Sequence, residues 1–228
     1  MEHNDSEILL VGFGDLSALV ADFKKTFPKK RVTFSKTVAQ GLSLIESDRV
    51  LIQPIYLLPG FEYHRLCREA AESGKKVTVG NPLLYCKEEV KKLAAFLTVE
   101  YGDRPVLFAG HGSHHELGQK TYKDLQEFLE ISSSNGAFLA VLEGSPRLDS
   151  VMDQLMESGI SELSLVPMTL TAGKHVLKDI FGDTPESFMS RLQGKGITPF
   201  PVYQPLLDFE PVRRMFIESC AKVFEAKE

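Results

Sequence analysis

The chain has 228 residues and a formal net charge of −5, with 43% apolar and 25% charged residues. This composition is typical of a globular protein that can bury one large core or two small ones. The acidic balance provides no basic field that would favour nucleic acid as a partner. The opening segment MEHNDSEILLVGF has an acidic flank and a short apolar run, so we expect neither a signal peptide nor a membrane span. The three cysteines form no CxxC pair, which is typical of reduced thiols in a cytoplasmic protein.

Short aliphatic or β-branched segments alternate with amphipathic segments along the chain. The first set of predicted strands comprises Ile8–Val11, Arg31–Phe34, Val50–Tyr56 and Lys76–Val79. The second set comprises Val106–Ala109, Ala137–Leu142, Leu163–Val166 and Thr198–Val202. Helical patterns fall between the strands, for example over Tyr122–Leu129. The sequence therefore predicts an α/β fold in which parallel sheets are covered by helices.

The two sets of elements also match each other in sequence. The segment ILLVGFGDLS (8–17) matches VLFAGHGSHH (106–115), and PIYLLPGFEY (54–63) matches PMTLTAGKHV (167–176) without a gap. NPLL (81–84) then matches QPLL (204–207). Chance similarity between βα units is the alternative to a duplication. We expect two similar halves, an N-terminal half over residues 1–100 and a C-terminal half over residues 101–228 that carries the metal site. The last helix, from Phe209, is expected to pack back on the first half.

Ligands of open parallel sheets bind beyond the carboxyl ends of the strands. Two such halves facing each other would form a cleft between the lobes. Its rim would comprise the first-half loops at Phe13 and Glu62 and the second-half loops at His111, Glu143 and His175.

Three of these residues follow successive strands of the second half and have side chains that suit a metal ion. His111 lies between two glycines, Glu143 closes an apolar strand, and His175 follows the next strand, at intervals of 32 residues each. Neutral imidazole binds metals and accepts protons near pH 7. Two imidazoles and one carboxylate suit a borderline ion such as Co²⁺, Ni²⁺, Fe²⁺ or Zn²⁺, with open positions for a substrate.

Each of the three also has an ordinary structural explanation. His111 would then be a loop residue that caps the following helix, Glu143 would begin an exposed loop, and His175 would begin a helix. If His111 faces the cleft, His114 and His115 are expected to point elsewhere, as helix-start or surface residues.

The segments GHGSHH, LEGSP and PMTLTAGKH, with PGFEY upstream, resemble the anaerobic cobaltochelatase family of cobalamin biosynthesis, the type II relatives of ferrochelatase. The resemblance covers most of the chain. It implies a bilobal fold that holds the tetrapyrrole sirohydrochlorin between two α/β halves and inserts Co²⁺ into it. The metal-binding residues of the family fall on His111, Glu143 and His175, and its first-half acidic residue falls on Glu62 beside Tyr63.

This resemblance implies a role for each residue. Metallation removes two pyrrole protons and strips water from the ion. We expect His111 and His175 to hold the ion with Glu143 and to accept these protons as the metal leaves. Glu62 would assist proton removal or position the ring, although a glutamate at a helix start explains it equally well.

Substrate contacts are expected at Phe13, Gly14, Tyr63 and Lys174. Lys174 would bind a propionate group, whereas a lysine on a solvated helix face is the ordinary explanation. The expected metal substrate is Co²⁺, with Ni²⁺, Fe²⁺ or Zn²⁺ as alternatives, and the reaction requires no organic cofactor. The expected partner is the tetrapyrrole, with neither nucleic acid nor membrane, and a homo-oligomer is left open. A non-catalytic tetrapyrrole or metal carrier and a metal-dependent hydrolase are the competing functions.

Overall fold

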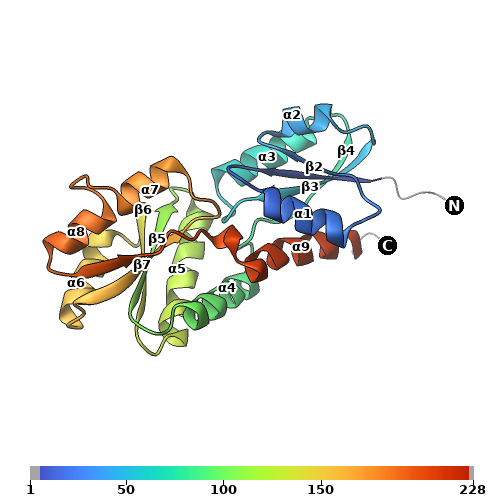
Figure 1. The fold of residues 1–228 in the computed structure, drawn as a ribbon. Coiled ribbons are helices and arrows are strands. Elements are labelled where there is room, and N and C mark those ends of the chain that lie inside the picture. Colours follow the sequence, from blue (N-terminus) through green and yellow to red (C-terminus); the bar gives the residue numbers. More distant parts are fainter. Residues whose placement is uncertain (1–5, 226–228) are drawn as a thin grey trace. The chain divides into compact units, whose positions relative to one another are not determined.

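The structure is a computed structural model that describes residues 6–225, with the backbone alone for residues 174–176. These residues form two compact units, each built on a four-stranded parallel sheet (Figure 1). Unit 1 comprises residues 6–85 and 207–225, and unit 2 comprises residues 86–206. The predicted α/β fold of two similar halves is confirmed. Among the described residues, no helix is long and apolar enough to cross a membrane.

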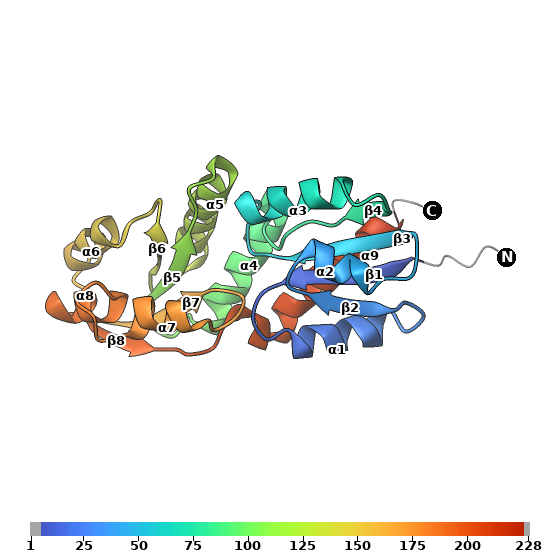
Figure 2. The same cartoon turned by 90° about the horizontal axis from the view of Figure 1, so that it is seen from above.

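Unit 1 has the strand order β2-β1-β3-β4. Its elements are β1 (Glu7–Gly12), α1 (Ser17–Thr26), β2 (Val32–Ser35), α2 (Val38–Ser43), β3 (Arg49–Ile55), α3 (Phe61–Ala71), β4 (Lys76–Val79) and α9 (Glu210–Glu225). Helices α2 and α3 cover one face of the sheet, and α1 and α9 cover the other (Figures 1 and 2). Because both faces are covered, every residue of β1 is buried and the strand is an almost continuous apolar run.

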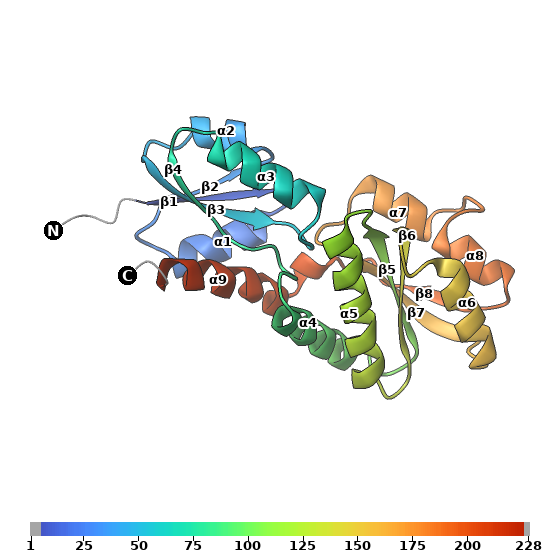
Figure 3. The same ribbon diagram turned by 180° about the vertical axis from the view of Figure 1, so that it is seen from behind.

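Unit 2 has the strand order β6-β5-β7-β8. Its elements are α4 (Lys87–Glu100), β5 (Val106–Gly112), α5 (Glu116–Ser132), β6 (Ala137–Glu143), α6 (Leu148–Glu157), β7 (Glu162–Met168), α7 (Lys174–Phe181), α8 (Phe188–Gly194) and β8 (Thr198–Pro201). Helices α4 and α5 lie on one face of the sheet, and α6 and α8 on the other (Figure 3). The face toward α6 and α8 buries an apolar cluster centred on Leu107, Leu155 and Leu192. A short 3₁₀ helix, Leu206–Asp208, follows β8.

The duplication extends to the register of the strands. Val11 of β1 pairs with Pro54 of β3, and the matching residues Ala109 and Pro167 pair in the same way in unit 2. After the third strand, the N–H of Leu83 donates to the carbonyl of Tyr56, and the N–H of Leu206 donates to that of Thr169. These residues also correspond in the repeat. The sequence match is therefore a structural repeat and not a chance similarity of βα units.

The helix that follows the fourth strand of each half packs in the other unit. Helix α4 belongs to unit 2 and packs against α5, and α9 belongs to unit 1 and packs against α1. The expected packing of the last helix on the first half is confirmed. The boundary expected between residues 100 and 101 follows the sequence repeat, whereas the packing changes units at residue 86.

Candidate metal site

His111 lies inside β5, one residue before its end, and not in a loop after the strand as expected. Strand β5 is a central strand that pairs with β6 on one side and β7 on the other. His111 is exposed at the carboxyl edge of this sheet. The following residue, Gly112, has a φ of 94°, and a Cβ there would lie directly against the carbonyl oxygen of Glu143. Glycine thus allows the end of β5 to approach the end of β6 closely.

Glu143 is the last residue of β6 and lies beside His111, as the sequence predicts. The distance between His111 Nε2 and Glu143 Oε2 is 3.9 Å. The side chains are 64% and 49% exposed, so both remain accessible to a metal ion from solvent. Solvent screening makes an ion pair of this kind worth little for stability. Its significance is the placing of an imidazole and a carboxylate side by side.

His114 is exposed as expected, but the expectation that its side chain points away from the predicted site is wrong. Its Nε2 atom lies 3.5 Å from Glu143 Oε2, nearer than that of His111. The chain turns after Gly112, so a residue three positions after His111 returns to the same carboxylate. The only sequence signal for this was the repeated histidine in GHGSHH, because the side-chain direction in a turn does not follow the period of a strand or a helix.

His115 begins helix α5, as expected. It is the N-cap residue, and its Nδ1 atom accepts a hydrogen bond from the N–H of Leu117 at 3.2 Å. That bond satisfies one of the unpaired donors of the first helical turn. His115 is therefore engaged in capping.

His175 and Lys174 lie in the first turn of α7, which begins after Gly173. The preceding strand β7 pairs with β5, with Met168 opposite Gly110. This backbone position agrees with a histidine at a helix start. The side chains of Lys174 and His175 lie outside the described residues, so the third predicted ligand stays a prediction. Within the part of the chain that the structure describes, no three His, Cys, Asp or Glu side chains are grouped to hold a metal.

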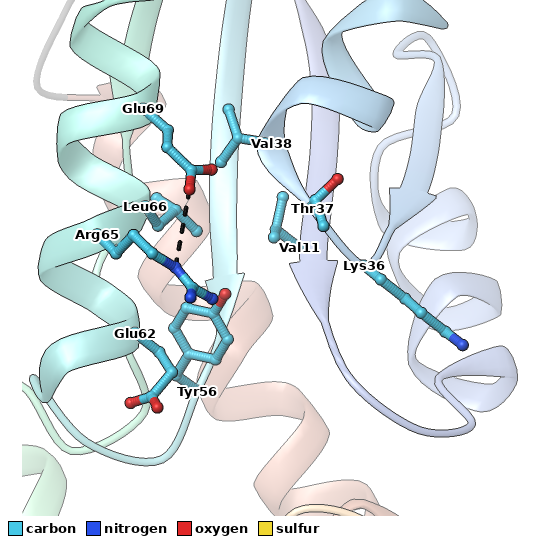
Figure 4. A pocket seen from close by; sticks show the side chains of 9 residues that line it. All are labelled: Val11, Lys36, Thr37, Val38, Tyr56, Glu62, Arg65, Leu66 and Glu69. Atoms are coloured by element: carbon cyan, nitrogen blue, oxygen red, sulfur yellow. Dashed lines mark ion pairs between the residues drawn. The ribbon is translucent and has the colours of Figure 1, made fainter.

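Glu62 lies in the first turn of α3, exposed at the carboxyl edge of the sheet in unit 1. It lines a pocket of about 210 Å³ together with Val11, Lys36, Thr37, Val38, Tyr56, Arg65, Leu66 and Glu69. Arg65 pairs with Glu69, with 3.7 Å between Nε and Oε1, and Lys36 extends away from them (Figure 4). Burial raises the pKa of Tyr56 to about 12, against the opposing effect of Arg65. Sequence reasoning found Glu62 but missed Lys36 and Tyr56 in the same pocket lining.

Exposed aromatic side chains occur in the same unit. Phe13 is exposed and stacks on Tyr56, with 6.0 Å between ring centroids, and the next residue, Gly14, has a φ of 81°. Tyr63 is buried and meets the exposed Tyr85 edge to face at 6.0 Å. Burial also raises the pKa of Tyr63. These rings follow β1, β3 and β4, whose carboxyl ends meet at one edge of the parallel sheet.

Two similar parallel α/β units, one of them with imidazole and carboxylate groups at the ends of adjacent strands, define a class of α/β proteins built from a repeated parallel sheet. The fold is similar to a solved structure described as CbiX, the terminal enzyme for biosynthesis of siroheme in denitrifying bacteria. The TM-score is 0.66 at 19% identity, covering 96% of this chain and 99% of the other.

The sequence then identifies the family. The family model of cobalt chelatase (CbiK) matches residues 11–225, so the chain belongs to this family. Sirohydrochlorin cobaltochelatase CbiKC of Nitratidesulfovibrio vulgaris is 28% identical over 171 residues, which are 71% of this chain and 60% of that protein. The match thus spans less than two thirds of that relative. Sirohydrochlorin cobaltochelatase of Salmonella typhimurium is 28% identical over 190 residues, 80% of this chain and 69% of the relative.

Proposed function

We propose that this protein inserts Co²⁺ into sirohydrochlorin. The observation that carries the proposal is the meeting of His111 and Glu143, 3.9 Å apart at the ends of adjacent strands, in a chain that a cobalt chelatase family model matches over residues 11–225. The two relatives named sirohydrochlorin cobaltochelatase support the same substrate and metal. The reaction is a metal insertion of the lyase type.

The ligands must collect the ion from water and then release it to the macrocycle. One or two imidazoles and a carboxylate leave coordination positions open, and a closed four-ligand cage would not. His111 and Glu143 supply two of these groups, and His175 is our proposed third. All three belong to unit 2, which supports the placing of the metal in the C-terminal half.

Metallation also releases two pyrrole protons. We assign them to His111 and His175, because an imidazole freed from the metal is a base near neutral pH. Glu62 is our proposed helper in proton removal or in positioning the ring. Phe13, Gly14, Tyr63 and Lys174 are our proposed substrate contacts, and the stacked pair of Phe13 and Tyr56 supports this for the flat face of a tetrapyrrole.

The physiological metal is Co²⁺ in this proposal, ahead of Ni²⁺, Fe²⁺ and Zn²⁺, which accept the same ligand types. The exchange of two protons for one divalent ion involves no change of oxidation state, so we propose no organic cofactor. The described cysteines Cys67, Cys86 and Cys220 are unbridged. They suit the reducing cytoplasm, where we place the reaction.

The test is the rate of Co²⁺ insertion into sirohydrochlorin, followed by the change in the visible spectrum of the tetrapyrrole. His111→Ala, Glu143→Gln and His175→Ala should each lower the rate at least about 100-fold, because each removes a metal ligand. Folding should be unaffected, since His111 and Glu143 are exposed.

The controls are His115→Asn, which removes an imidazole and keeps an N-cap residue, and Glu116→Gln, which neutralises a nearby exposed carboxylate. Both should keep the wild-type rate. Wild-type protein that binds Co²⁺ and sirohydrochlorin without accelerating insertion over a protein-free mixture would identify a carrier and contradict the proposal.

A further inference from the structure

His114 and Glu143 form a second pair of metal-binding groups beside the predicted triplet. Both side chains are largely exposed, at 69% and 49%, and Nε2 of His114 lies 3.5 Å from Oε2 of Glu143. Nε2 of His111 lies 3.9 Å from that same oxygen. Two imidazoles therefore border one carboxylate oxygen, one at the end of β5 and the other in the turn that follows it.

The two spacings differ in how well they suit a shared ion. With metal–ligand bonds of about 2.1 Å, two ligands of one ion lie about 3.4 Å apart in a tetrahedral site and about 3.0 Å apart at adjacent octahedral positions. The 3.5 Å between His114 and Glu143 matches the tetrahedral value. The 3.9 Å between His111 and Glu143 would need a ligand–metal–ligand angle of about 135°. His114 and Glu143 are thus the better spaced pair before any metal is bound.

The turn that carries His114 is held on both sides of that residue. The N–H of Ser113 donates to the carbonyl of Glu143 at 3.1 Å, which ties the turn to the end of β6. The N–H of His115 donates to the Ser113 hydroxyl, also at 3.1 Å. Directly after β6, Gly144 has a φ of 89°, and a Cβ there would lie 2.6 Å from the Ser113 carbonyl oxygen. Backbone contacts therefore set the position of His114 relative to Glu143.

We propose that His114 and Glu143 form a capture position for Co²⁺, from which the ion passes to His111 while Glu143 remains bound. This inference deepens the proposed function and rests on it. In the capture step two water ligands of the ion are replaced by the neutral imidazole and the carboxylate. In the transfer step the imidazole of His111 replaces that of His114, with no change in charge or oxidation state.

A site with only two protein ligands suits this role. Its remaining positions keep water, so binding is weak and exchange is fast. High exposure means that the ion can reach both groups without a large loss of hydration.

The experiment measures Co²⁺ binding to the full-length protein without tetrapyrrole, by visible absorption and by equilibrium dialysis. Made in a His111→Ala background, where the ion cannot pass on to the stronger site, His114→Ala should weaken Co²⁺ binding about tenfold. In the insertion assay the single variant His114→Ala should raise the KM for Co²⁺ by a similar factor, with a smaller change in kcat. His111→Ala should instead lower kcat. His115→Asn, the matched control in the same turn, should leave both the dissociation constant and the KM at wild-type values.

Co²⁺ affinity that His114→Ala leaves unchanged in the His111→Ala background, together with an unchanged KM in the single variant, would overturn the capture position. A loss confined to kcat would also overturn it, because His114 would then act in insertion and not in capture. The binding measurement separates the two proposals. If the wild type fails to metallate sirohydrochlorin but His114→Ala still lowers Co²⁺ affinity in the His111→Ala background, the enzymatic function is wrong and the metal position is retained.

Discussion

At the scale of single residues, Gly112 determines how closely the strand ends that carry the site's side chains approach each other. Its φ of 94° is rarely adopted by other residues, and the space where a Cβ would lie is occupied by the backbone of Glu143. The close approach places Glu143 within reach of His111 and His114. The sequence shows glycines on both sides of His111, which is typical of a tight turn. It could not predict which strand the turn approaches, because that depends on the order of the strands.

Gly112→Ala should therefore have two effects: strain from the left-handed backbone conformation and a clash of the new Cβ with the backbone of Glu143. Gly159 provides the matched control, since its φ is 68° but a Cβ there would meet nothing within 4 Å. Gly159→Ala should cost about 1 kcal/mol from the left-handed conformation alone. Gly112→Ala should cost more than about 2 kcal/mol and weaken Co²⁺ binding, because the end of β6 must also move. Urea unfolding and Co²⁺ titration of both variants test this, and equal effects on both quantities would contradict it.

At the scale of elements, helix α5 packs against the end of β5 that carries His111. Tyr122 is a buried residue of this helix, and burial raises its pKa to about 12, against the opposing effect of a hydrogen bond from the Gly112 backbone. A Cβ on Gly110 would lie 3.1 Å from the Tyr122 hydroxyl oxygen, so the helix and the end of β5 are in close contact. The helical pattern predicted over Tyr122–Leu129 located this helix. The tyrosine was missed because the sequence does not reveal which strand residue a polar group on the buried face will meet.

Tyr122→Phe keeps the ring and removes the hydroxyl. It should lower the free energy of unfolding by about 1 kcal/mol, because the hydroxyl packs closely against the end of β5 and its loss leaves a small gap there. It should also weaken Co²⁺ binding, a change that a defect confined to the core would not produce. Tyr203→Phe, at an exposed tyrosine, is the control for hydroxyl removal. Wild-type Co²⁺ affinity in Tyr122→Phe would show that the hydroxyl does not position His111.

At the scale of the whole molecule, the repeat was the most informative sequence signal. All eight predicted strands are present, and the gapless match from Pro54 and Pro167 corresponds to a strand register that the two sheets share. Helix α4 packs in unit 2 and helix α9 packs in unit 1, so each leaves the unit that contains the strand before it. The sequence predicted this only for α9. Both helices are amphipathic, and an apolar stripe does not specify which of two similar units it will cover. The same limit applies to the metal site, where the strand ends were predictable but the direction of His114 in its turn was not.

Burial of proton-releasing groups in both units predicts sensitivity to alkaline pH. Cys220 of α9, in unit 1, and Tyr122, in unit 2, both have pKa values raised to about 12 by burial. The thiol of Cys220 ordinarily has a pKa of 9.0, so from pH 9 upward the unfolded chain loses a proton that the folded chain keeps. Stability associated with this group is fully present below pH 9 and is lost as the pH rises toward 12.

The test compares the free energy of unfolding at pH 8 and pH 10 under reducing conditions. Cys220→Ala should lose about 1 kcal/mol less than the wild type over this interval, because its share of the proton release is absent. Cys86→Ala, at an exposed cysteine, should follow the wild type. The tyrosines, whose ordinary pKa is 10, also begin to contribute below pH 10, but equally in both proteins, so the difference between wild type and variant isolates the thiol. Parallel pH dependence in wild type and Cys220→Ala would mean that the thiol is not held protonated by the packing of α9 on unit 1.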